Sequence, residues 1–498
     1  MSEASPAATR PAGVLAAMCL TQAAILLDVT IVNVALPDIQ RDLGLSSGSL
    51  VWVVSAYTLA LAALVPASGT LGDRYGRKRV MLLGLTVFVT ASALCALSGN
   101  DIALVAARAL QGVGGAMMAA LTLSILTSAF PPHRRAAAIG LWTATAGIGF
   151  GLGPVIGGFL LSVSGWSSIF WVSVPLGATA FLLTMIFVGE SRDPQARPLD
   201  VVGAVLVGSG LLFITFGLTQ SGNAGWDSPS VGGSLAGGAA LLGLFVLWER
   251  RVRIPLLPRA LWHDVMFVGS NLAFVLLYLA FTGMFLFISL YFQDVRGWSA
   301  LATGLSWLTM NAPFLLISLL ISKLIRRFGA HRLVLTGVLI AAAGMASFAV
   351  LTADGSVVPA FVGYLLVGVG FGAATPALSA EAMSRVPADS AGVGSAALNS
   401  GRQIGSSVGL ALLGAVAATV AGIPPGGSYL AAGTGPFIAG MRAAMIVASA
   451  VLLLAGVVLV LADRAVRRRA ATAATLSQAL KREHDDDHQA AGVPPAAP

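Results

Sequence analysis

A single acidic side chain lies deep within the first long apolar run of the chain. The run 14–36 is long enough to span a bilayer, and Asp28 is the only acid well inside it. An ionised carboxylate at that depth costs ~3 kcal/mol, so Asp28 should face a cavity, pair with a base or hold a proton. A carboxyl group whose pKa depends on its surroundings can carry a proton. The alternative is a structural ion pair of Asp28 with Arg108 or Arg402.

Arg108 and Gln111 are polar groups of another apolar run, 102–130. With Gly112 they lie on one face of a helix, because residues three and four apart are neighbours. A guanidinium group inside a helical bundle stays charged and lowers the pKa of a carboxyl group that approaches it. This favours proton release from Asp28, although Arg108 could instead anchor carbonyl groups at a helix end.

The polar groups of the second half lie in two places. Asn399, Arg402 and Gln403 repeat the same helical spacing. Glu381 lies three residues beyond the expected end of an apolar run. A salt bridge of Glu381 with Arg385 or Arg402 is favoured over a second proton site.

Helical geometry separates the polar side chains of the first run. Thr21 and Asp28 are seven residues apart and share a face, whereas Asn33 points about 140° away from Asp28. Asp28 is therefore assigned to a cavity and Asn33 to a helix contact. The side chains expected to line that cavity are Thr21, Asp28, Gln111, Asn399, Arg402 and Gln403.

The composition indicates which elements must position these groups. Of 498 residues, 29 are Lys or Arg and 21 are Asp or Glu, whereas 57% belong to the set AVILMFWYC. The mean hydropathy is +0.87. So much apolar surface can be buried only in lipid, which excludes a soluble enzyme, a disordered protein and a nucleic-acid-binding domain. Cys19 and Cys95 are expected to be small buried hydrophobic residues.

Fourteen apolar runs are long enough to cross a bilayer core about 30 Å thick. The runs are 14–36, 50–71, 80–98, 102–130, 136–163, 168–188, 201–218, 231–248, 265–292, 301–320, 333–351, 358–378, 393–420 and 437–461. An even number places both termini on one side. Arg41, Arg296 and Arg442 then lie on the opposite side, whereas most of the 29 basic residues lie on the side of the termini. This asymmetry predicts cytoplasmic termini.

Two pairs of landmarks predict an internal repeat. Gly76 and Gly329 follow the second and tenth runs, and Gly112 and Gly368 lie within the fourth and twelfth. The two offsets agree within three residues, which indicates two related halves and an insert between them. The predicted units are a cytoplasmic N-terminus (1–13), a six-helix bundle (14–189), a two-helix insert (200–250), a second six-helix bundle (265–462) and a disordered cytoplasmic tail (463–498).

An ordered set of glycine, acidic and basic residues follows the second apolar run. Glycines allow a tight turn between helices, and the charged groups can bind helix ends or facing charges. Such contacts can break and re-form, so the run is predicted to be a cytoplasmic gate loop rather than an ordinary basic loop. Its residues are Gly69, Asp73, Arg74, Gly76, Arg77 and Lys78.

The fifth apolar run carries a glycine at every fourth position. Gly149, Gly153 and Gly157 form a smooth stripe on which another helix can pack closely, and Gly158 adjoins it. Pro154 removes one backbone donor and permits a bend. These features suit an interface that rocks, although static packing of small residues would look the same.

Four of these stretches resemble the major facilitator superfamily. Residues 69–78 are similar to its loop 2–3 signature, G-x-L-x-D-R-x-G-R-K, and 27–37 to the first-span signature of the fourteen-helix drug:proton antiporters. Residues 108–115 resemble the fourth-span motif, and 149–158 the fifth-span antiporter motif, G-x-x-x-G-P-x-x-G-G. The sixth span departs from the family pattern W-R-W-I-F-x-I-N-x-P, because Ser167 and Ser173 stand where the pattern has Arg and Asn.

The resemblance covers about residues 14–462 and implies an all-α integral membrane protein of the major facilitator fold. That fold would contain two six-helix pseudo-repeat bundles and two extra linker helices. The family implies a proton-coupled antiporter that exports hydrophobic or cationic drugs or antibiotics by alternating access. Proton-coupling roles are expected for Asp28, Arg108 and Glu381. The family links the glycine stripe of the fifth span to antiport.

Other functions on this scaffold stay open, including export of an endogenous antibiotic, metabolite, siderophore or lipid precursor, and import of a nutrient. A membrane enzyme would need catalytic polar groups at one interface, and a non-transporting sensor would tolerate loss of Asp28. The sequence has no P-loop and no H-E-x-x-H motif, and its five His lie in expected cytoplasmic loops or the tail. We therefore expect no enzymatic activity, cofactor or metal. The expected partners are a small molecule, protons and membrane lipid but no nucleic acid, for a monomer in the cytoplasmic (inner) membrane.

Overall fold

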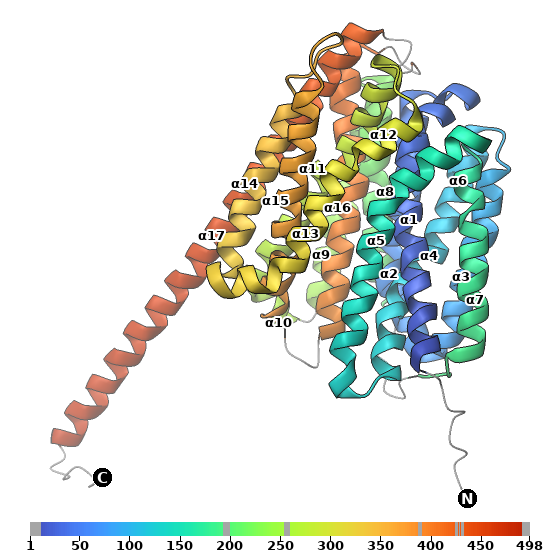
Figure 1. Ribbon diagram of the computed structural model, residues 1–498. Helices are drawn as coiled ribbons and strands as arrows, with labels where there is room; N and C mark the ends of the chain where they lie inside the picture. The colour runs from blue at the N-terminus through green and yellow to red at the C-terminus, as the bar shows by residue number, and fades with distance from the viewer. Residues whose placement is uncertain are drawn as a thin grey trace, which may run out of the picture.

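The chain forms a bundle of long helices (Figure 1). The computed structural model describes residues 11–490 except 193–199, 253–258, 387–390, 424–426, 428 and 430–432. Over these residues, 13 helices have the length and apolar composition to cross a membrane. Helix α5 adds a shorter apolar stretch, Leu152–Ser164, so each of the fourteen predicted spans corresponds to a helix or a broken helix. The prediction of an all-α membrane protein is confirmed.

The first half of the chain contains seven helices: α1 (Pro11–Leu43), α2 (Ser47–Tyr75), α3 (Arg77–Ala96), α4 (Asp101–Ala129), α5 (Pro132–Ser164), α6 (Ser168–Trp171) and α7 (Ser173–Phe187). The middle segment contains α8 (Val201–Ala224) and α9 (Pro229–Arg251). The second half contains α10 (Arg259–His263), α11 (Val265–Leu290), the π-helical turn η1 (Tyr291–Val295), α12 (Ala300–Ser306), α13 (Leu308–Phe328), α14 (Ala330–Phe348), α15 (Val358–Met383), α16 (Ala391–Val420) and α17 (Thr434–Ala490).

The landmark glycines of the two halves occupy matching places. Gly76 (φ 113°) separates α2 from α3, and Gly329 (φ 82°) separates α13 from α14, so both turns use backbone angles that favour glycine. Gly112 of α4 lies against the carbonyl group of Tyr57 in α2. Its counterpart Gly368 packs in the same way on a carbonyl group of α13. The repeat read from glycine spacing therefore reflects the same helix packing in both halves.

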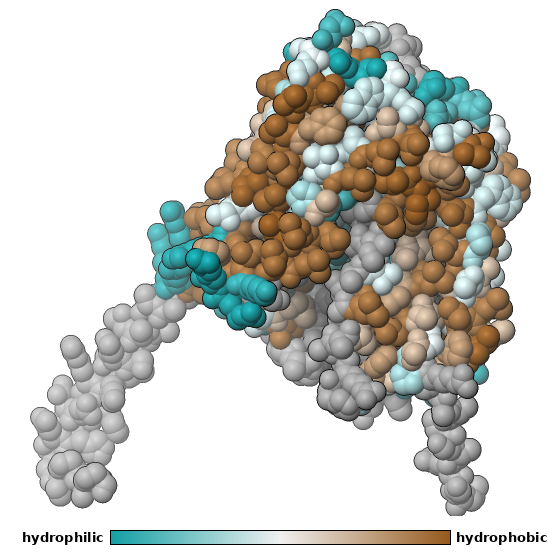
Figure 2. Space-filling view, in the orientation of Figure 1, coloured by the Kyte–Doolittle hydropathy of each residue, from teal (hydrophilic) through white to brown (hydrophobic). Residues whose placement is uncertain are grey.

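The sides of the bundle are apolar, as a lipid-facing surface requires. Large hydrophobic side chains such as Ile186, Val163 and Leu319 are 65%, 66% and 68% exposed. Figure 2 shows brown, hydrophobic residues over most of the visible flank, with teal, hydrophilic residues gathered near its two ends. This distribution matches a polytopic membrane protein whose helix ends meet water.

The two halves meet near the ends of the helices that lie away from the start of α1. Helix α1 contacts α11, α2 contacts α16 and α5 contacts α12. The side-chain amide of Gln293 donates a 2.9 Å hydrogen bond to the carbonyl oxygen of Val34. Nearby, the Arg41 guanidinium lies 3.6 Å from the Asp294 carboxylate. The structure therefore joins its halves at this end.

The two-helix middle segment reaches both halves through its first helix, α8. Helix α8 packs against α2 and α16, and α9 packs against α8. The indole nitrogen of Trp226 donates a 3.0 Å hydrogen bond to the hydroxyl group of Thr419 at the end of α16. The insert thus borders both halves of the bundle.

Two helices run further than the apolar runs predict. The sequence places Glu381 three residues beyond a span, but α15 continues to Met383 and includes Glu381 in its last turn. Alanine-rich sequence after Pro376 propagates the helix past the apolar stretch. The predicted end of this run at residue 378 therefore falls short of the end of the helix at Met383.

The chain beyond residue 463, which composition predicts to be disordered, continues α17 to Ala490. It leaves the bundle as a single helix at the end where α1 begins (Figure 1). Alanine, leucine, lysine and arginine are strong helix formers, and Arg467 pairs with Asp463 one turn earlier at 2.8 Å. The high helix propensity of these residues therefore explains why the segment is helical, whereas its polar composition alone predicts disorder.

Candidate functional site

Asp28 lies in a fully buried polar cluster between α1 and α4. One carboxylate oxygen accepts a 2.7 Å hydrogen bond from Nη1 of Arg108, and the other accepts a 2.7 Å bond from the amide of Gln111. Gln111 also donates to the hydroxyl group of Ser92 at 2.8 Å. Asp28 and Gln111 are 0% exposed and Arg108 is 1% exposed. Of the two ion pairs that the sequence allows for Asp28, the structure contains the one with Arg108.

The guanidinium group of Arg108 is enclosed on its other sides. Its Nε donates a 3.0 Å hydrogen bond to the carbonyl oxygen of Val53 in α2. The ring of Tyr57 lies 4.4 Å from the guanidinium carbon, and the ring of Phe170 lies 5.8 Å away. Cation–π contacts of this kind stabilise a desolvated arginine. Arg108 therefore serves both as the partner of Asp28 and as an anchor for a carbonyl group.

A buried ion pair of this kind has a definite chemistry. Two charges removed from water are stabilised chiefly by each other, so loss of either charge leaves the other uncompensated. Protonation of Asp28 would cancel its charge and release Arg108 toward its remaining partners, Gln111 and Val53. The ion pair therefore links the charge of Asp28 to the packing of α1 against α4.

The remaining polar side chains of α1 bond to their own helix. The Thr21 hydroxyl, 0% exposed, donates to the carbonyl oxygen of Ala17 at 2.8 Å. The Asn33 amide, 4% exposed, donates to the carbonyl oxygen of Val29 at 2.8 Å. Neither Thr21 nor Asp28 is exposed to solvent in this conformation, so the predicted cavity lining at these positions is closed here.

The polar groups of the second half form a separate set. The Arg402 guanidinium lies 4.9 Å from the ring centre of Tyr278, and its Nη1 lies 3.4 Å from the side-chain oxygen of Asn399. Gln403 is half-buried beside Arg402 on α16, and Glu381 is half-buried at the end of α15. The structure does not bring Arg402 to Asp28. Among the described residues, the ion pairs at 4.0 Å or less do not include Glu381.

The predicted gate loop is held within the first half. Both Nε and Nη2 of Arg77 lie 2.8 Å from one carboxylate oxygen of Asp73. The backbone N–H of Lys78 donates to the Glu190 carboxylate at 3.1 Å, and its ammonium group donates to a carbonyl oxygen of α7 at 2.8 Å. Gly76 lies against the same carboxylate of Glu190, and its φ of 113° favours glycine at this turn.

The other members of that loop pack beside it. Gly69 lies near Ala120 of α4, and Arg74 is exposed with its guanidinium 5.5 Å from the Tyr75 ring. The loop therefore ties α2 and α3 to α4 and to the end of α7. Its role as a gate stays a prediction.

The glycine stripe of α5 lies against α1. Gly149 lies against the backbone of Ala23, whereas Gly153 lies against Thr30 and Ile31, and Gly157 against Ile31, about two turns further along α1. Pro154, buried between Gly153 and Gly157, presents its carbonyl group to Gly304 of α12. The stripe thus packs on the helix that carries Asp28.

Gly158 completes this contact on the other side of α5. It packs on the backbone of Ala300 and Leu301, at the start of α12. Glycines of α5 therefore touch both α1 of the first half and α12 of the second half, so α5 can transmit movement between them.

Several functional neighbours are missing from the sequence prediction. Tyr57 and Ser92 complete the cluster around Arg108 and Gln111, but an isolated tyrosine or serine in an apolar run carries no distinguishing signal. Gln293 and Asp294 join the halves from η1. Both residues directly follow the apolar run 265–292, and this position at the end of a span is the only signal that the sequence offers for them.

We predict that Tyr57→Phe leaves stability within about 0.5 kcal/mol of the wild type, whereas Tyr57→Ala destabilises by about 3–5 kcal/mol. The Tyr57 hydroxyl is buried without a hydrogen-bond partner among the described residues, while its ring covers Arg108. Thermal unfolding of the purified variants in one detergent measures both effects. A large loss of stability for Tyr57→Phe would contradict this prediction and would mean that the hydroxyl group has a hydrogen-bond partner in the membrane.

A helical membrane bundle built from two halves, with an ion pair buried between its helices, is typical of membrane transporters. The family model described as Major Facilitator Superfamily matches residues 18–410, which is most of the chain. The chain belongs to the major facilitator superfamily, and it is a multi-pass membrane transporter rather than an enzyme.

Relatives and solved structures agree with this assignment. The multidrug resistance protein Stp of Mycobacterium tuberculosis is 35% identical over 79% of this chain and 73% of its own length. The methylenomycin A resistance protein of Streptomyces coelicolor is 34% identical over 85% of this chain and 89% of its own length. The tetracenomycin C resistance and export protein of Streptomyces glaucescens is 32% identical over 83% and 77%.

Two solved structures show the same fold. A peptide transporter of the POT family has a TM-score of 0.67 at 14% identity, over 91% of this chain and 95% of that one. A bacterial homologue of the human lysosomal transporter Spinster has a TM-score of 0.63 at 20% identity, over 91% of this chain and 97% of that one. The prediction of the major facilitator fold is confirmed.

Proposed function

We propose that the chain exports hydrophobic or cationic drugs or antibiotics in exchange for protons across the cytoplasmic membrane, with both termini in the cytoplasm. The observation that carries the coupling is the buried Asp28–Arg108–Gln111 cluster between α1 and α4. The substrate class rests on relatives whose names describe multidrug resistance and export of or resistance to antibiotics. The orientation is supported by the charge asymmetry, because only Arg41, Arg296 and Arg442 of the 29 basic residues are assigned to the outer side.

The position of the contacts between the halves supports alternating access. With cytoplasmic termini, the hydrogen bond of Gln293 to Val34 and the packing of α5 on α12 lie on the outer side. Closure at that side is incompatible with an outward-open conformation. Opening it would separate α5 from α12 while α5 stays packed on α1, so movement of the halves reaches the helix of Asp28.

The transport cycle follows from the charge of Asp28. Protonation from the outer side neutralises the carboxylate and weakens the attraction for a cationic substrate, which then leaves. Deprotonation on the inner side restores the charge and favours substrate capture, with Arg108 beside the carboxylate as its counter-charge. One buried carboxylate predicts about one proton per cycle. Glu381 and Arg402 would act on the substrate or the gate from the second half.

The test is substrate-driven proton release from inverted membrane vesicles. An imposed proton gradient, acidic inside, is followed with a pH-sensitive dye while monovalent cations, divalent analogues and neutral antibiotics are added. We expect release with monovalent or neutral compounds and less release with divalent ones, because one carboxylate balances one positive charge. Vesicles without the transporter are the control.

Each outcome distinguishes the candidates. Export of a divalent dye as efficient as that of its monovalent analogue would contradict the single-carboxylate mechanism. Release with one antibiotic alone would favour dedicated antibiotic export, as the names of two relatives describe for those proteins. Absence of release with every compound would contradict drug:proton exchange and favour a metabolite, siderophore or lipid precursor.

A further inference from the structure

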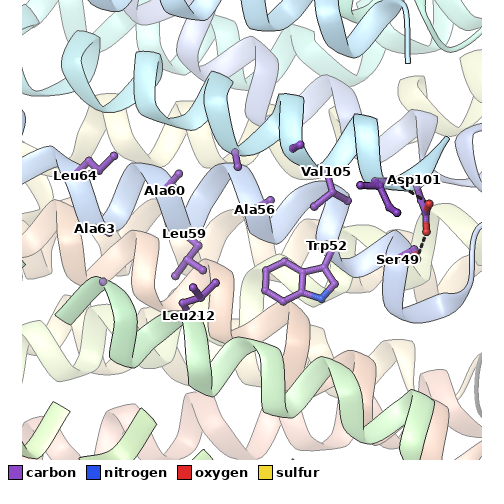
Figure 3. A pocket seen from close by; sticks show the side chains of 14 residues that line it. Ser49, Trp52, Ala56, Leu59, Ala60, Ala63, Leu64, Asp101, Val105 and Leu212 are labelled. Carbon is purple, nitrogen blue, oxygen red and sulfur yellow. Dashed lines mark hydrogen bonds between the residues drawn. The ribbon is translucent and has the colours of Figure 1, made fainter. Parts of the chain in front are cut away.

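A long apolar groove runs along the outside of the bundle between α4 and α8, with α2 as its floor (Figure 3). Its volume is about 620 Å³. The floor extends from Ser49 to Leu64, which corresponds to about 22 Å at 1.5 Å of rise per residue. Small side chains such as Ala60 and Ala106 keep it open, and Trp52 forms part of its wall. The groove is therefore long and narrow, as a hydrocarbon chain requires.

One end of the groove is acidic. The Ser49 hydroxyl donates a 3.0 Å hydrogen bond to one carboxylate oxygen of Asp101, and the other oxygen accepts a 2.8 Å bond from the backbone N–H of Ile102 (Figure 3). Asp101 is half-buried in the first turn of α4, at the start of a stretch that is apolar enough to cross a membrane. Among the described residues, the ion pairs at 4.0 Å or less do not include Asp101. Its negative charge is available to a cation from outside the protein.

The groove is separate from the proton-coupling cluster. Its lining residues come from α2, α4 and α8 and do not include Asp28, Arg108 or Gln111. Ala106 and Ala109 lie on a face of α4 that points away from the cluster and toward lipid. A molecule in the groove would enter sideways from the bilayer.

We propose that this groove binds a phospholipid whose headgroup carries an ammonium group, phosphatidylethanolamine, with one acyl chain along α2 and the ammonium group at Asp101. An ammonium group can donate hydrogen bonds to the carboxylate and neutralise its charge. An anionic headgroup such as phosphatidylglycerol would be repelled by the same charge. A helix of another protein chain could also fill the groove, but without a basic side chain near Asp101 it would leave this carboxylate unpaired. The proposal does not depend on the transport activity.

The test measures lipid binding to the purified, delipidated full-length chain in detergent. Phosphatidylethanolamine and phosphatidylglycerol with identical acyl chains are titrated, and bound lipid is counted by native mass spectrometry. We expect about fivefold tighter binding of phosphatidylethanolamine, the range of a partly exposed charge pair. Asp101→Asn should remove this preference, because it keeps the side-chain shape and loses the charge.

Two further variants separate the headgroup from the chain. Asp227→Asn removes an exposed acid from the α8–α9 turn and should keep the preference. Ala106→Trp fills the groove from an exposed position and should weaken binding of both lipids. Equal binding of the two lipids to the wild type, or a preference that survives Asp101→Asn, would overturn the proposal. So would a dimer that Ala106→Trp converts to a monomer, because the groove would then hold a second copy.

Discussion

Asp28→Asn is expected to reduce substrate-driven proton release to the level of vesicles without the transporter, a loss of at least about tenfold. The amide can still accept a hydrogen bond from Arg108 but cannot exchange a proton. The variant also leaves the buried Arg108 without its counter-charge, which costs about 3–5 kcal/mol. Loss of activity and loss of stability must therefore be measured separately.

The double variant Asp28→Asn/Arg108→Gln separates these two effects. Removal of both charges relieves the uncompensated arginine, so thermal unfolding should return toward the wild type. Proton release should remain absent, because the exchangeable carboxyl group is still missing. Asp354→Asn, an exposed acid between α14 and α15, is the matched control and should behave as the wild type.

The same pair of measurements decides between the two interpretations of the ion pair. Recovery of both stability and proton release in the double variant would mean that Asp28 and Arg108 have only a structural role. Proton release that survives Asp28→Asn alone would place the proton site elsewhere, with Glu381 the next candidate. Proton release is measured in vesicles at matched protein levels, and stability is measured by thermal unfolding of the purified variants.

The fold could be predicted from sequence because lipid imposes simple rules on it. Apolar runs of about 20 residues, alternating basic loops and the matched glycines Gly112 and Gly368 identify the helices and their repeat. Hydropathy does not define helix ends, because polar residues with high helix propensity continue a helix beyond the membrane. This explains why α15 includes Glu381 and α17 extends to Ala490.

The candidate site could be predicted only in part. A charged residue inside an apolar run is conspicuous, so Asp28 and Arg108 were identified, and their pairing was one of two options. Choosing between Arg108 and Arg402 required three-dimensional positions, since both lie far from Asp28 in sequence. Arg402 instead lies beside Tyr278, and no rule of residue spacing predicts a contact between residues so far apart in sequence. The contacts of Tyr57 and Ser92 were likewise invisible because both residue types are common in membrane helices.

Gly158→Val is expected to shift the conformational equilibrium away from the closed outer contact by about 5- to 150-fold. A Cβ at Gly158 would lie 2.6 Å from the carbonyl oxygen of Ala300 and 2.7 Å from the Cα of Leu301. Both atoms belong to backbone, so the clash cannot be relieved by rotating a side chain. Overpacking of this kind costs about 1–3 kcal/mol, which is the source of the expected range. Transport should fall because the state in which this outer contact is closed becomes scarce.

Cysteine labelling measures this shift directly. Gln293→Cys places a thiol at the buried contact between the halves, in a background with Cys19 and Cys95 replaced by serine. A membrane-impermeant maleimide, added from the side opposite the termini, should react faster when Gly158→Val is present. Gly233→Val is the matched control, since no atom lies within 4 Å of a Cβ at that helical position. Unchanged labelling together with lost transport would show that the glycine stripe provides static packing, not a moving interface.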